Sequence, residues 1–126
     1  MALFYITDEM AAEDVNDDEP VVLVAGGELD FHASPTLRER IAAHISAGKR
    51  RVLLDISTVT FIDSTAIGVL IASAVKLQNV DGGSLAVVCA DDNEKVLRIF
   101  DIAGVASLIE LHPSRHEALS ALAIAG

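Results

Sequence analysis

The chain has 126 residues, of which 52% are hydrophobic, enough for one core and too few for two. Its 19 acidic and 9 basic residues give a formal net charge of -10, which repels phosphate backbones and anionic lipid surfaces. We therefore expect a single domain over residues 1–126 that binds neither nucleic acid nor membranes directly.

The strands are expected where short β-rich apolar runs occur. From residue 21 onward these runs alternate with segments of helical period, which is typical of parallel strands joined by helices. Before them, residues 8–20 are rich in acidic residues and end in Pro20, which favours a solvated acidic loop. We expect strands at 3–7, on a sheet edge, and at 21–26, 51–56, 84–90 and 107–111.

The first helix is marked at both ends. Ser34 precedes Pro35, which predicts an N-cap followed by proline at the first helical position. Apolar residues then recur at helical spacing until Gly48, where we expect the helix to end.

Two later helices carry similar signals. Asp92 or Asn93 is expected to cap a helix that Gly104 ends, and Ser114 with Glu117 forms a capping box for the last helix. Together the elements predict an α/β fold with a mixed, mostly parallel sheet of about four or five strands, flanked by about four helices.

The most informative segment is residues 53–70, L-L-D-I-S-T-V-T-F-I-D-S-T-A-I-G-V-L, interpreted as a buried strand, a short loop and the start of a helix over 65–80. Together with G-E-L-D at 27–30, it closely resembles the STAS domain of anti-sigma factor antagonists. The resemblance runs from about residue 21 to 122. It implies the fold of that domain and a phosphoacceptor at Ser64, the serine after the loop aspartate. Ala66 departs from the family, where many members carry glycine.

Ser64 can also be interpreted from its position alone. If the helix begins near Thr65, Ser64 is its N-cap, and its hydroxyl accepts a hydrogen bond from the first turn. An added phosphate is tolerated there because unpaired N–H groups and the positive end of the helix dipole face it. Phosphorylation then opposes docking of a partner that had packed around the bare hydroxyl. The alternative is a cap without chemistry.

The neighbours of Ser64 allow two interpretations each. Asp63 orients the serine or helps a kinase recognise it, or it makes a loop Asx-turn. Thr65 is a second acceptor or serves only the first helical turn. Asp30 contacts the partner near Ser64 or caps the region of Ser34.

The helix over 65–80 has two stripes. Its core-facing stripe leaves a neighbouring one of short or apolar residues that includes Ala66, Val69 and Ser73. We expect this second stripe to face a partner, and the alternative is that the core wraps the helix on both sides.

Motifs of enzymes and metal sites are missing from the sequence. There is no phosphate-binding glycine loop and no serine in a nucleophile elbow, and the four histidines and the single Cys89 are too scattered for a metal site. That cysteine cannot form an intrachain disulfide, and no signal peptide or membrane-spanning run is recognised. We expect a cytoplasmic protein without cofactor or enzymatic activity.

The resemblance also implies the partners. The unphosphorylated chain binds an anti-sigma factor that is itself a serine kinase, so that a sigma factor is released and transcription is regulated indirectly. The kinase then phosphorylates Ser64, and a serine phosphatase reverses the modification. The alternative is a STAS scaffold or an accessory subunit of a stress-sensing or lipid-transport complex, without a phospho-switch. Weak nucleotide binding is a third hypothesis.

Overall fold

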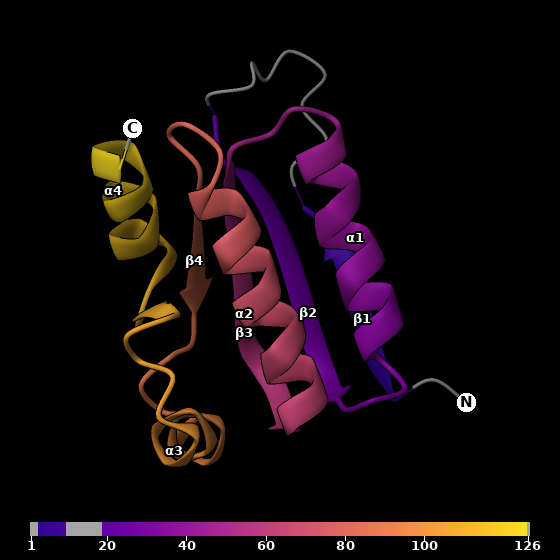
Figure 1. The fold of residues 1–126 in the computed structure, drawn as a ribbon. Helices are drawn as coiled ribbons and strands as arrows, with labels where there is room; N and C mark the ends of the chain where they lie inside the picture. Colours follow the sequence, from indigo (N-terminus) through magenta and orange to yellow (C-terminus); the bar gives the residue numbers. More distant parts are fainter. Residues whose placement is uncertain (1–2, 10–18, 126) are drawn as a thin grey trace.

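The computed structural model describes residues 3–9 and 19–125, so most of the predicted acidic loop lies outside the described residues. Within them the chain forms one five-stranded sheet, in the order β1-β2-β3-β4-β5, and four helices (Figure 1). The strands are β1 (Phe4–Asp8), β2 (Val21–Leu29), β3 (Arg51–Ile62), β4 (Ser84–Val88) and β5 (Glu110–His112). The helices are α1 (Ser34–Ser46), α2 (Ser64–Gln78), α3 (Glu94–Ala103) and α4 (Arg115–Ala125).

The sheet is mixed, as the sequence predicts. β1 is antiparallel to β2 at one edge, and all other neighbours are parallel. A parallel pair needs a crossover connection, and α1, α2 and α3 supply one each. The predicted α/β fold, with a mixed sheet of four or five strands and about four helices, is therefore confirmed.

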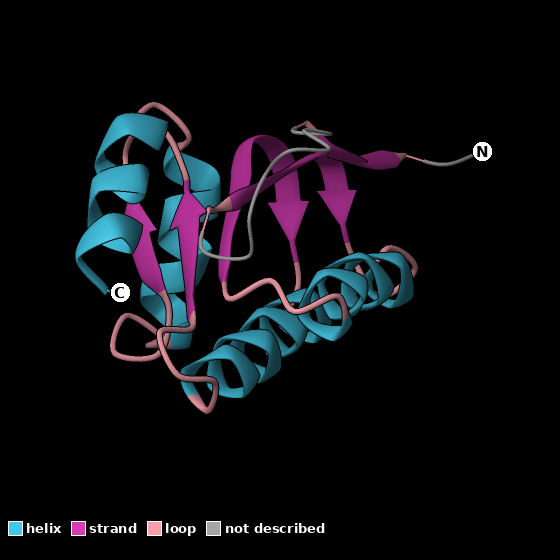
Figure 2. Ribbon diagram, turned by 90° about the horizontal axis from the view of Figure 1, so that it is seen from above, coloured by secondary structure: helices cyan, strands magenta, loops and turns pink. Residues whose placement is uncertain are grey.

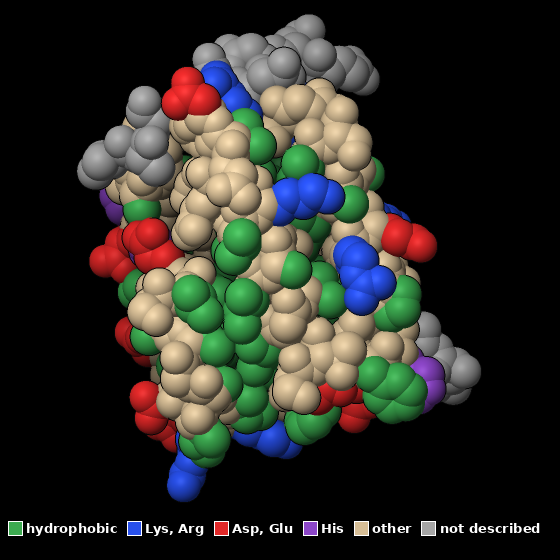
Figure 3. All heavy atoms as spheres, in the orientation of Figure 1, with side chains coloured by type: hydrophobic (Ala, Val, Ile, Leu, Met, Phe, Trp, Pro, Cys, Tyr) green, Lys and Arg blue, Asp and Glu red, His purple; other side chains and the backbone are tan. Residues whose placement is uncertain are grey.

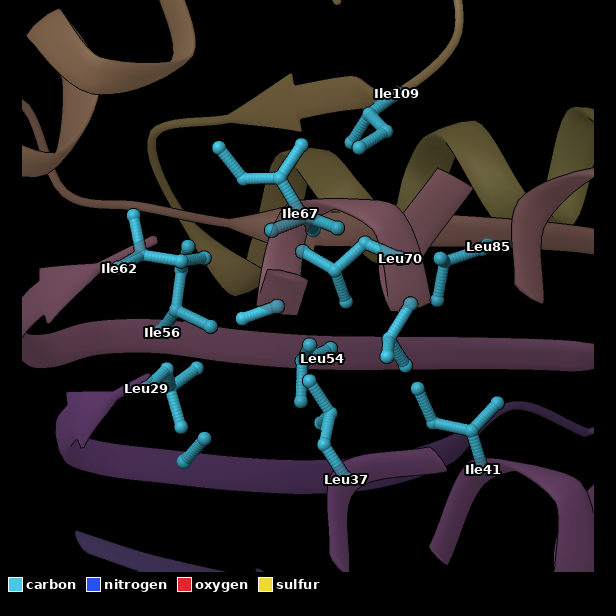
Figure 4. Packing of buried hydrophobic residues seen from close by; sticks show 14 of the residues in the cluster. Leu29, Leu37, Ile41, Leu54, Ile56, Ile62, Ile67, Leu70, Leu85 and Ile109 are labelled. Atoms are coloured by element: carbon cyan, nitrogen blue, oxygen red, sulfur yellow. The ribbon is translucent and has the colours of Figure 1, made fainter. Parts of the chain in front are cut away.

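Helices cover both faces of the sheet, and each face has its own core (Figures 1 and 2). On one face, α1, α2 and α3 pack on β2, β3 and β4 in the larger cluster, where Leu54 of β3 and Leu70 of α2 are fully buried (Figure 4). On the other face, Ala118 and Leu122 of α4 pack on Leu53 and Ala86 in a smaller cluster. β3 contributes to both, which explains its continuous apolar run.

β3 is longer than predicted. The sequence suggests a strand over 51–56 and then a loop, but the strand continues to Ile62. Beyond Asp55, where β4 ends, β3 pairs only with β2, through two register shifts beside Gly26 and Gly27. Gly27 has a φ of +79°, a conformation that glycine adopts without strain. The polar residues of this segment thus lie on a strand extension.

The later elements differ slightly from their predictions. β4 ends at Val88, so Cys89 lies just past the strand, although it is buried as expected. β5 begins at Glu110, because residues 104–109 form a turn in which the N–H groups of Leu108 and Ile109 both donate to the carbonyl of Val105, at 2.8 and 2.9 Å. The apolar residues of that turn resemble a strand in sequence.

The predicted helix ends are partly confirmed. Gly104, with a φ of +68°, follows α3, and Asn93 is its N-cap, accepting a 3.4 Å hydrogen bond from the N–H of Val96. The hydroxyl of Ser114 accepts from the N–H of Glu117 at 3.2 Å. At α1, however, the predicted N-cap is wrong.

The N-cap of α1 is Ala33, which makes no side-chain cap hydrogen bond. Ser34 is the first helical residue, and its hydroxyl donates to the carbonyl oxygen of Asp30 at 2.9 Å. The hydroxyl is thus engaged with the preceding turn, which fixes the entry of the helix.

An ion-pair network joins three segments of the chain. The guanidinium of Arg115, at the start of α4, donates to Asp55 of β3 at 2.8 Å and to both carboxylate oxygens of Glu9. Asp55 also accepts from the N–H of Ser57 at 2.9 Å. Burial raises the pKa of Asp55, but the Ser57 and Arg115 hydrogen bonds outweigh it and the net pKa is lowered. Asp55, inside β3, therefore has a structural role.

Candidate functional site

Ser64 is exposed at the start of α2, but it is not the N-cap. Asp63 is, with extended backbone (φ -108°, ψ 177°), and its carboxylate accepts a 2.9 Å hydrogen bond from the N–H of Ala66. Both residue types are favoured N-caps, and the carboxylate, not the hydroxyl, takes the position here. The Ser64 hydroxyl is therefore not needed to cap the helix.

Asp63 also fixes Ser64 relative to the sheet. The N–H of Asp63 donates to the carbonyl of Leu29 at 3.1 Å, and the Asp63 carbonyl accepts from the N–H of Ile67 at 3.0 Å. The junction between β3 and α2 is thus bonded to the end of β2. Because Asp30 follows Leu29 directly, the Asp30 turn and Ser64 both lie at the carboxyl ends of strands β2 and β3.

The carboxylate of Asp30 serves mainly its own turn. It accepts hydrogen bonds from the N–H groups of His32 at 2.9 Å and Ala33 at 3.1 Å, just before α1. This is the capping role that the sequence left open. Its side chain is 29% exposed, and its second oxygen lies 3.7 Å from Nδ1 of His32.

The second stripe of α2 does not face outward. Ala66, Val69 and Ser73 have exposed fractions of only 0, 5 and 8%, because α1 packs beside α2 and closes over them. The expectation that these three side chains form an exposed partner surface is wrong, because they are buried where α1 packs beside α2. The sequence could not show where α1 lies.

A different face of α2 is exposed. Ser64 and Thr65 begin it, and Gly68, Ala72 and Val75 follow at helical spacing. These residues are small or uncharged, and the first charged side chain along the helix is Lys76. In Figure 3 the middle of this side of the molecule shows mainly uncharged surface with basic side chains among it, and acidic side chains lie toward the edges. In the sequence, this row of small residues at helical spacing is the pattern that could have indicated the exposed face of α2.

Two exposed aromatic side chains near the carboxyl ends of β2 and β3 were not predicted from the sequence. Phe61 of β3 is 38% exposed and pairs in register with Glu28 of β2, and Phe31, just past β2, is 60% exposed. The Phe31 ring lies against the His32 ring, with centroids 4.0 Å apart. Exposed aromatic rings are a typical component of a protein interface.

Asn93 connects α3 to the same end of β3. Its amide donates to the carbonyl oxygens of Val59 at 2.8 Å and Ser57 at 3.3 Å, on the side of β3 that β4 leaves uncovered. The same side chain caps α3. One residue thus holds the strand extension that leads to Ser64.

The described residues contain no group of three or more His, Cys, Asp or Glu side chains that could hold a metal ion. No described helix is long and apolar enough to cross a membrane. The site at the β3–α2 junction therefore consists of an exposed hydroxyl, carboxylates and apolar surface. Such a constellation suits a protein-binding module with a modifiable serine at the start of a helix.

Comparison with known proteins places this module. The family model of the STAS domain matches residues 11–118. An anti-sigma-B factor antagonist of Bacillus subtilis is 34% identical over 98 residues, which cover 76% of this chain and 84% of the relative. A relative of the same name from Staphylococcus aureus is 26% identical over 100 residues, covering 79% of this chain and 90% of the relative.

Solved structures agree on the fold. An anti-sigma factor antagonist from Mycobacterium paratuberculosis superposes with a TM-score of 0.76 at 24% identity, covering 94% of this chain and 95% of the other. The unphosphorylated form of the antagonist SpoIIAA gives a TM-score of 0.72 at 22% identity, covering 94% and 96%. The chain is a STAS domain protein. Within that class it belongs to the anti-sigma factor antagonist family, whose members are regulators without enzymatic activity.

Proposed function

We propose that this chain is a cytoplasmic antagonist that binds an anti-sigma factor while Ser64 is unphosphorylated and releases it after phosphorylation. The partner is a serine kinase that modifies Ser64, and a serine phosphatase restores the hydroxyl. The observation that carries the proposal is the exposed Ser64 hydroxyl at the first position of α2, with the cap made by its neighbour Asp63. Modification of Ser64 therefore leaves the cap intact.

The electrostatics of the position favour a switch over unfolding. A phosphate at the first turn faces the positive end of the α2 dipole, which compensates part of its charge. It also adds about -1.5 to -2 charge next to Asp63, on a chain whose net charge is already -10. The domain tolerates the group, whereas a partner surface packed around the hydroxyl meets new bulk and charge.

The partner surface that we propose surrounds Ser64. It includes Thr65, the partly exposed side chain of Asp30 and the exposed Phe31. Asp63 contributes by fixing the serine, while Ala66, Val69 and Ser73 act from inside, by setting the position of α2 against α1.

The test compares binding of the cognate anti-sigma kinase to the wild-type chain, Ser64→Asp and Ser64→Ala. We expect Ser64→Asp to weaken binding at least about tenfold, which corresponds to about 1.4 kcal/mol, and Ser64→Ala to retain binding but accept no phosphate. Ser120→Asp, at an exposed serine on α4, adds the same charge elsewhere and serves as the matched control.

Mass spectrometry of the chain from its native cell adds an independent measurement. Phosphate on Ser64 is the expected result. A chain that carries none under any growth condition, and whose Ser64→Asp variant binds as tightly as the wild type, contradicts the switch and supports the scaffold alternative.

A further inference from the structure

A small apolar cavity lies away from the Ser64 junction, between α3, the 104–109 turn and β5. Its volume is about 190 Å³. In Figure 1, α3 and the orange segment that follows it lie at the lower left, on the opposite side of α2 from α1. Six of the seven residues that line the cavity are apolar, and Asp101 is the single charged one. The lining residues are Leu97, Phe100, Asp101, Val105, Ala106, Ile109 and Leu111.

The walls of the cavity are held apart by the backbone. Gly104 takes the left-handed conformation and its N–H donates to the carbonyl oxygens of Phe100 at 3.2 Å and Asp101 at 3.1 Å, so the chain turns away from α3 at once. The carbonyl of Val105 then accepts from two N–H groups of the turn. Because these bonds fix the turn, the side chains cannot simply close the space.

The volume and lining define what fits. A cavity of about 150 Å³ lined by Leu, Ile and Phe in another protein stays dry and binds benzene, whereas bound water needs polar partners. Here Phe100 and Ile109, only 3 and 2% exposed, form an apolar floor, while the exposed Asp101 and Ala106 lie at a mouth that is open to solvent. Around it, Ile102 and Leu108 are 76 and 47% exposed.

We infer that this cavity is a binding site for a small, uncharged apolar molecule about the size of benzene or indole. Burial of apolar ligand surface drives the binding, without hydrogen bonds that discriminate among such molecules. This site is separate from the proposed phosphoacceptor, and its occupancy does not require Ser64.

The test is a titration of the ¹⁵N-labelled chain with indole, followed by amide chemical shifts. We expect saturable shifts at the lining residues in the wild type and loss of saturation in Ala106→Leu, which fills the cavity. Ala103→Leu adds the same side chain to α3 at an exposed position outside the cavity, and we expect it to bind indole as the wild type does.

Circular dichroism of each variant establishes that it is folded, and Ala106→Val offers a smaller filling substitution if Ala106→Leu is not. Absence of saturable shifts in the wild type up to the solubility of indole overturns the inference. Shifts that persist unchanged in a folded cavity-filling variant overturn it too. The inference is also overturned if the wild type does not bind indole and Ala106→Leu weakens self-association or partner binding. The cavity then belongs to a protein interface.

Discussion

Replacing Arg115 by methionine removes the charge that compensates Asp55 and keeps most of the aliphatic stem. The side chain of Asp55 is 13% exposed, so the variant leaves a largely buried carboxylate whose remaining hydrogen bond comes from the N–H of Ser57. Breaking a fully buried ion pair costs about 3–5 kcal/mol, but Arg115 is 37% exposed and solvent screens the pair. We therefore expect a loss of about 1–2 kcal/mol at pH 7, or a Tm lower by about 4–8 °C.

The pH dependence distinguishes this ion pair from packing. The pKa of Asp55 is lowered in the fold, so the pair stabilises the chain above the ordinary aspartate pKa of 3.8, and that contribution is lost as the pH falls through the lower folded value. The stability difference between wild type and Arg115→Met is expected to shrink below about pH 4. The chain has no tryptophan, so urea unfolding is followed by circular dichroism at pH 7, 5 and 3.

Glu9→Gln is the control for the exposed arm of the network. Glu9 also has a lowered pKa, because Arg115 donates to it, but its side chain is 48% exposed and we expect little change in stability at any pH. A stability loss in Arg115→Met that is equally large at pH 7 and pH 3 would mean that the methionine is poorly packed, and the electrostatic reasoning would be refuted.

Two further predictions concern Asn93 and Cys89. Asn93→Ala removes a helix cap and leaves the Ser57 and Val59 carbonyls without their amide donor, so we expect the free energy of unfolding to fall by about 2 kcal/mol. Urea titration measures it beside Asn79→Ala, a control at an exposed position. Equal stability of the two variants contradicts this expectation. Burial raises the pKa of the Cys89 thiol to about 11. We therefore expect a thiol reagent at pH 8 to modify Cys89 far more slowly in the folded chain than in the urea-unfolded chain. Comparable rates would contradict the burial of this thiol.

The element order and fold class could be predicted because they depend on local signals. Alternating apolar runs gave the strands and helices, and Gly104 ended α3 where expected. The end of β3 could not be predicted, since Ser57, Thr58 and Thr60 suggest a loop unless one knows that β2 extends alongside them and pairs with Thr58, Val59, Phe61 and Ile62. The side chain of Thr60 is exposed, so its polar character is compatible with a strand as well as with a loop.

The motif makes Ser64 the candidate phosphoacceptor, but it does not predict the exact place of Ser64 in the helix. Asp63 and Ser64 are adjacent residues with nearly equal cap preferences, and the bond from Asp63 to Leu29 of another strand decides between them. The burial of Ala66, Val69 and Ser73 likewise depends on α1, a separate segment of the chain. Local pattern identifies such residues, whereas tertiary packing assigns their roles.

Only Asp63 separates the last residue of β3 from the first residue of α2. Because a single residue connects the two elements, the start of α2 cannot move without displacing β3, which lies in the middle of the sheet. The phosphate that we propose on Ser64 would therefore change the shape and charge of a surface point whose backbone stays in place. A partner that reads it needs no rearrangement of the backbone and can be matched to one rigid geometry.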